Sequence, residues 1–281
     1  MEHEQEEMWK VKVAAWIHDP AEKALVLLRD PAGHEGGTVR LLREMLFGSK
    51  VDSHIVSLVQ TADRWAAAAD RPQIPRSVSI NYDRQPVLIH PLDGSEYDLK
   101  GLNIPVAQIR AVSFDHFQHL CSSKSGERDW KRIFLTLWRR GPETPAKDLG
   151  ALWEVLPADT RIPAYSIWEH LDLTSALAGV MVRDPGQRPA LLKFTIGPVQ
   201  GFIEQARSSS DLWAGSHLLS RMMWEGLRVI CDELGPDVVI FPHLRGVPLV
   251  DAWLKQLGVL SDGPNGLSGG LMKIPCWSLR S

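Results

Sequence analysis

Histidine and aspartate stand next to each other at His18-Asp19, directly before Pro20. Imidazole nitrogens and carboxylate oxygens are ligands of divalent metal ions, and such an ion can activate water for attack on a phosphodiester. Lys23 follows Asp19 by about one helical turn, where its ammonium group would contact a phosphate. We therefore predict a hydrolytic metal centre in which His18, Asp19 and Lys23 are catalytic and His18 and Asp19 bind the metal.

Three further residues are weaker candidates for metal ligands. His34 lies in a glycine-rich loop, and His54 and Asp63 lie nine residues apart in one expected helix, which we interpret as roughly one face. The alternative for His34 is a surface loop residue, and the alternative for His54 is a packed histidine. His170 follows Trp168 in another expected helix, and we interpret it as a packed residue rather than a ligand.

A second kind of site is predicted where the β-like run LLKFTI (191–196) turns into a helix. A tight turn from a strand into a helix exposes backbone N–H groups, which favour phosphates. There is no GxxxxGK[ST] motif, and ordinary packing of a helix on a sheet is the alternative. The candidate nucleotide-binding residues are Gly197, Pro198, Val199, Gln200, Gly201 and, further along the helix, Ser216.

Helical elements must position the first site. Apolar residues at helical spacing predict two helices within 8–29 that meet at His18-Asp19, because Pro20 interrupts the run. The same spacing predicts helices within 38–47, 51–70, 111–140 and 164–182. Between them, Asp93-Gly94 indicates a small β-hairpin near 77–100.

The polar segment 182–190 is rich in proline and glycine and is the predicted domain boundary. After it, strands are expected at 191–196 and 238–241. Between them a long helix should run from about 199 to 234 and end at Gly235-Pro236. This order predicts a β-α-β unit.

Composition limits the classes of function. The chain has 281 residues, of which 44% are hydrophobic and 23% charged, as in a globular protein. The net charge of −3 means that nucleic-acid contacts need a local basic patch or a metal. The three cysteines form no CxxC pair, which argues against a cysteine zinc site. Neither a signal peptide nor an apolar run of membrane-spanning length is evident, so we expect a cytoplasmic protein without a membrane partner.

Five stretches, in family order over residues 10–253, together resemble the large subunit of type III-B (Cmr-type) CRISPR interference complexes. The resemblance covers the N-terminal portion of that subunit. The most specific stretch is KFTIGPVQGFIEQARSSSDLWAGSHLLS, which is similar to the start of the family's first palm domain. The others are WIHDPAEKAL, TADRWAAAADRP, LPADTRIPAYSIWEHLDLTSALA and FPHLRGVPLVDAWL.

The resemblance implies an α+β chain with two domains. A mainly helical, permuted HD domain would span 1–185, and the first half of a ferredoxin-like (βαβ) polymerase/cyclase palm domain would span 190–281. It also implies metal-dependent cleavage of single-stranded DNA with Mn, Ni or Mg. The implied partners are other Cmr-type subunits, guide RNA and target RNA.

This chain departs from the family pattern in lacking the GGDD motif of the cyclase. ATP binding is therefore expected only with a complete palm pair, and cyclic oligoadenylate synthesis is not expected from this chain alone. A catalytically inactive scaffold that docks the subunit in the RNA-guided complex is the alternative. A free-standing HD phosphohydrolase is disfavoured because such an enzyme has no need of the palm-like half.

Overall fold

The structure is a computed structural model that describes residues 2–26, 35–48, 51–70, 87–89, 96–98, 104–122, 128–145, 150–159, 165–184 and 186–261. Two compact units, Met1–Pro189 and Ala190–Ser281, make up the chain. The division falls inside the segment 182–190. Among the described residues, no helix combines the length and the apolar character needed to cross a membrane.

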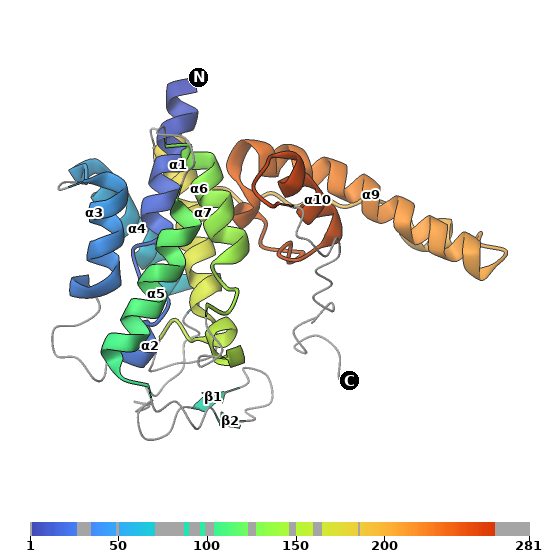
Figure 1. Cartoon of the computed structure of the whole chain (residues 1–281). Helices are drawn as coiled ribbons and strands as arrows, with labels where there is room; N and C mark the ends of the chain where they lie inside the picture. Colours follow the sequence, from blue (N-terminus) through green and yellow to red (C-terminus); the bar gives the residue numbers. More distant parts are fainter. Residues whose placement is uncertain are drawn as a thin grey trace. The chain divides into compact units, whose positions relative to one another are not determined.

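The first unit is built mainly from helices (Figure 1). As expected, two helices flank His18-Asp19. The helices are α1 (Glu2–Trp16), α2 (Lys23–Val26), α3 (Arg40–Phe47), α4 (Ser53–Asp70), α5 (Val106–Cys121), α6 (Trp130–Arg140) and α7 (Ile167–Arg183). Two short helical turns, η1 (Glu35–Val39) and η2 (Gly150–Val155), precede α3 and α7.

The core of this unit lies where α1, α4 and α7 pack against one another. Each helix contributes apolar side chains at helical spacing, with small alanines that let the helices approach closely. The buried cluster consists of Val11, Ala14, Ala15, Ile55, Leu58, Val59, Ala62, Ala178 and Met181. Tryptophans extend it, and Trp16 stacks on Trp168 with ring centroids 5.8 Å apart. This packing places the end of α1 and the start of α7 beside α4.

A two-stranded antiparallel sheet lies within the range where the hairpin is expected. It pairs β1 (Val87–Ile89) with β2 (Glu96–Asp98), with Leu88 opposite Tyr97. The turn at Asp93-Gly94 lies outside the described residues.

The second unit contains α8 (Val199–Ile203), α9 (Ser209–Leu234), the short turn η3 (Pro236–Val238) and α10 (Pro248–Gln256). The helix expected from 199 to 234 is divided, because the Ser208 side chain caps α9 by accepting a hydrogen bond from Asp211 N, 3.1 Å away. Its end is as predicted: Gly235 adopts φ 97° after the last turn.

Neither expected strand of the second unit forms among the described residues. Residues 191–196 have no regular structure, and 238–241 begin with the end of η3. A strand needs neighbouring N–H and C=O groups, and here the side chains meet no covering layer: Leu191 is 89% exposed and Phe241 is 90% exposed. The mainly helical part of the predicted fold is therefore observed, and the β-α-β part is not.

Candidate metal centre

The turn after α1 orients His18. Pro20 cannot continue a helix, so the chain leaves α1 at Trp16 and turns through His18 and Asp19. His18 Nδ1 lies 2.5 Å from the carbonyl oxygen of Ala15 and donates to it. This bond leaves Nε2 as the nitrogen with a lone pair, which is the tautomer found in metal-binding histidines. The side chain is 9% exposed.

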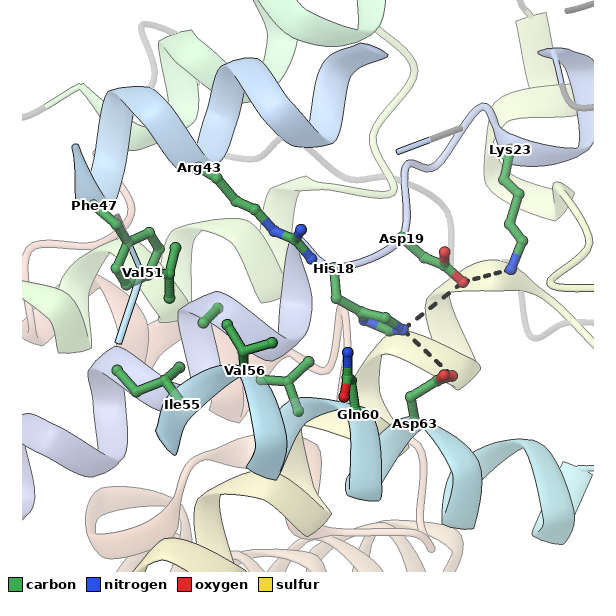
Figure 2. A pocket seen from close by; sticks show the side chains of 12 residues that line it. His18, Asp19, Lys23, Arg43, Phe47, Val51, Ile55, Val56, Gln60 and Asp63 are labelled. Carbon is green, nitrogen blue, oxygen red and sulfur yellow. Dashed lines mark hydrogen bonds and ion pairs between the residues drawn. The ribbon is translucent and has the colours of Figure 1, made fainter. Parts of the chain in front are cut away.

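Three side chains from separate elements converge on one point. Asp63 comes from α4 and His170 from the first turns of α7, and the packing of α4 on α7 joins them across 107 residues. His170 Nε2 lies 3.1 Å from Asp63 Oδ1, and His18 Nε2 lies 3.4 Å from the same oxygen. One ligand atom of each residue lies within 4.8 Å of the others. Figure 2 shows His18 and Asp63 pointing toward one another.

Asp19 and Lys23 border this cluster. Asp19 is 6% exposed, and its Oδ2 accepts a hydrogen bond from Lys23 Nζ at 2.6 Å. The same oxygen lies 3.8 Å from His18 Nε2 and 3.9 Å from His170 Nε2. Lys23 is therefore held beside the cluster by an ion pair.

Asp63 remains ionised in this setting. The hydrogen bond with His170, together with the contact with the His18 ring, lowers the pKa of Asp63 well below its ordinary value, although partial burial opposes the shift. The cluster therefore offers an anionic oxygen beside two imidazoles at neutral pH.

The geometry fits a divalent metal ion. Two ligands about 2.1 Å from an ion and at right angles are about 3 Å apart, close to the His170–Asp63 separation of 3.1 Å. His18 Nε2 is buried and satisfied by no hydrogen bond among the described residues. Two nitrogens and one oxygen suit Mn²⁺ or Ni²⁺ better than Mg²⁺, which prefers oxygen.

Glu22 anchors the segment that follows the turn. Its buried carboxylate accepts hydrogen bonds of 2.6 Å from Thr38 in η1 and from Ser113 in α5. Burial raises the pKa of Glu22, against the effect of these bonds. Glu22 thus ties the segment that carries Asp19 and Lys23 to two other elements.

Of the two weaker histidine candidates, His54 does not join the cluster and His34 is not described. His54 is exposed at the start of α4, and its backbone N–H is bonded to Asp52. Nine residues correspond to two and a half helical turns, so His54 and Asp63 lie on opposite sides of α4 and the same-face interpretation is wrong. His34 lies outside the described residues.

His170 is buried, as a packed residue would be, but it also faces Asp63. A signal for this role was present in the sequence. The segment 166–178 is apolar or small along its buried side, so a histidine there has to find a polar partner inside the unit.

The candidate nucleotide-binding residues of the second unit are exposed. Residues 197 and 198 precede the short helix α8, residues 199–201 begin it, and Ser216 lies on α9. The neighbouring Gly215 serves packing between the two helices, because a Cβ there would lie 3.2 Å from the Phe202 ring. Nucleotide binding by these residues stays a prediction.

Comparison with known proteins finds two matches to CRISPR-associated proteins. Residues 191–275 match the family model described as CRISPR-associated protein Cmr2, N-terminal. A curated relative, the CRISPR system Cmr subunit Cmr2 of Pyrococcus furiosus, is 55% identical over 125 residues, which are 44% of this chain and 13% of the relative.

Both of these matches are to the Cmr2-type large subunit. The resemblance to the Cmr-type large subunit of type III-B systems is thereby confirmed. A second relative, the CRISPR system CMR subunit Cmr2 of Saccharolobus solfataricus, is 24% identical over 271 residues, covering 87% of this chain and 24% of the relative.

A solved structure shares the fold of this chain. It is described as the Type III-B Cmr-beta cryo-EM structure of the apo state, with a TM-score of 0.61 and 23% identity. The match covers 92% of this chain and 25% of the solved one. The chain thus spans about a quarter or less of the length of each relative.

Proposed function

We propose that the first unit is an HD-type domain that cleaves single-stranded DNA with a divalent metal ion, as part of the large subunit of a type III-B CRISPR effector in antiviral defence. One observation carries the proposal. His18, Asp63 and His170 converge, with ligand atoms within 4.8 Å of one another, beside a cationic side chain that lines the same cavity.

In the proposed hydrolysis, some residues bind the metal and another binds the phosphate. His18 and His170 would each offer Nε2 and Asp63 would offer Oδ1 to the metal, which when bound supplies an activated water and neutralises phosphate charge. Lys23 would hold a phosphate oxygen, and its 2.6 Å ion pair with Asp19 orients it toward the cluster. Attack of this water on phosphorus would break one P–O ester bond, leaving one product with a terminal phosphate and the other with a hydroxyl group that has taken up the proton lost by the water.

The test is cleavage of a labelled single-stranded DNA with Mn²⁺ or Ni²⁺. We compare the wild type with the double variant His18→Ala/Asp19→Ala and with His54→Ala, an exposed histidine outside the cluster. The double variant should lose cleavage and His54→Ala should keep it. Equal cleavage by all three proteins would show that the activity does not come from this site.

A scaffold role is the second candidate, and two observations favour it. The cluster pairs internally through His170–Asp63 and Lys23–Asp19, which can hold it together without an ion. The second unit also exposes large apolar side chains such as Trp213 and Phe241, which are typical of surfaces that contact other proteins. Absence of a bound transition metal after purification, together with no thermal shift on adding Mn²⁺, would support this role.

For the second unit we propose that the segment 197–201 and Ser216 contribute to an ATP site only within a complete palm pair. Other Cmr-type subunits, guide RNA and target RNA are the proposed partners of the assembled subunit. The chain alone should make no cyclic oligoadenylate from ATP, and formation of that product by the isolated chain would refute this assignment.

A further inference from the structure

The metal centre forms one end of a larger cavity of about 350 Å³ between α3, α4 and the turn after α1. His18, Asp19, Lys23 and Asp63 line the polar end (Figure 2). The opposite end is apolar and is lined by Phe47, Val51, Ile55, Val56 and Val59. One continuous space therefore joins a site for an anion to an apolar recess.

The recess is already shaped. Ile55 and Val59 are buried in the helical core, so their positions are set by packing. The Phe47 ring stacks on Trp130, with centroids 5.1 Å apart and planes 25° from parallel. Val56 is 38% exposed and lies at the entrance. A flat apolar group can enter this recess without rearrangement of its walls.

Polar groups lie between the two ends. Arg43 lines the cavity and forms no ion pair with any described residue, whereas Arg40 on the same helix pairs with Glu44 at 2.8 Å. Its guanidinium is suited to phosphate oxygens. The Gln60 amide, with donors and an acceptor, also lines the cavity and can bond the edge of a planar heterocycle.

We propose that this cavity binds one nucleotide of the strand, with its unpaired base in the recess of Phe47, Val56 and Val59 and its phosphate at the metal end. The proposal rests on the proposed function and adds a base-binding subsite to it. The volume lies at the low end of ligand pockets, enough for one nucleotide and too small for a base pair with its two sugars. Single strands are therefore selected because only an unpaired base can enter.

The first experiment measures binding to the full chain with Mn²⁺ present, by calorimetry. The two ligands are deoxyadenosine monophosphate and 2-deoxyribose 5-phosphate, which differ by the base. The base should raise the affinity about tenfold, within the range that one stacked base contributes. Val56→Trp fills the entrance and should abolish this difference, while Leu41→Trp, a control with the same 38% exposure outside the lining, should keep it. Equal affinity of the two ligands for the wild type, or no binding of either, overturns the proposal.

The second experiment separates this proposal from the proposed function. A single-stranded DNA with one abasic nucleotide is incubated with the wild type and Mn²⁺, and any cleavage is mapped at each phosphate. Cleavage next to the abasic position should fall about tenfold. If all positions are cut equally, the nuclease stands and the base subsite fails. If no strand is cut but the base still raises affinity, the subsite stands and the nuclease fails.

Discussion

Replacing His170 by alanine removes one imidazole from the cluster while leaving His18 and Asp63 in place. Loss of a residue that merely supports a metal ligand lowers metal affinity 10- to 100-fold, so loss of a ligand should cost at least about 100-fold, or about 2.8 kcal/mol. The variant also loses the 3.1 Å bond to Asp63. Because Asp63 is 39% exposed, that loss should lower the free energy of unfolding by only about 1 kcal/mol.

The pH dependence of this loss has a definite sign. Interaction with His170 is the largest cause of the lowered pKa of Asp63, so the pKa should rise toward its ordinary value of 3.8 in the variant. A depressed pKa stabilises the folded state above the pKa of the unfolded chain. The difference in the free energy of unfolding between wild type and variant should therefore have its largest value at neutral pH. It should shrink as the pH falls below about 4 toward the depressed pKa of the wild type.

The assay is calorimetric titration with MnCl₂ at neutral pH, together with urea unfolding at several pH values. His116→Ala is the control, because His116 is half-buried, lies against Trp153 and bonds the Gly141 carbonyl at 3.2 Å, outside the cluster. It should lose stability and keep Mn²⁺ affinity. Wild-type affinity in His170→Ala, or equal losses in both variants, would refute the metal centre.

Three further predictions concern buried groups around the site. Because burial raises the pKa of Glu22, the folded state holds its proton more tightly, and stability should fall as the pH rises from 4.5 through the raised pKa. Glu22→Gln should flatten this part of a urea-unfolding pH profile, and an unchanged profile would contradict the reasoning. Gly179→Ala should lower the free energy of unfolding by about 1–3 kcal/mol, because the new Cβ would lie 2.8 Å from Cγ of the fully buried Lys12. If urea unfolding shows no change in that free energy beyond the experimental error, the Lys12 side chain can move aside. Burial raises the pKa of Cys121 to about 12, so iodoacetamide should label this thiol only after denaturation. Peptide mapping by mass spectrometry measures the labelling, and a labelled Cys121 peptide from the native protein would contradict the prediction.

Much of the helical unit follows from local rules in the sequence. Pro20 separates two helices at His18-Asp19, and Gly235-Pro236 ends α9, because backbone restrictions at proline and glycine act over a few residues. Apolar spacing likewise places α4 and α7. The strands predicted at 191–196 and 238–241 are not formed. A strand depends on hydrogen bonds to a neighbouring strand, and the pattern of apolar residues within one segment does not show whether such a neighbour exists.

The residue types at His18, Asp19, Lys23 and Asp63 led to the prediction of a metal centre, and the metal itself stays a prediction. The sequence also carries the resemblance to the Cmr2-type large subunit, which the comparisons confirm. Only the tertiary structure brought together the residues that we propose as the ligand set. Rotation along α4 turns His54 away from Asp63, and the packing of α7 on α4 brings His170 from 107 residues away to within 3.1 Å. Spacing along a chain describes one helix face, whereas a metal site is defined by where faces of different helices meet.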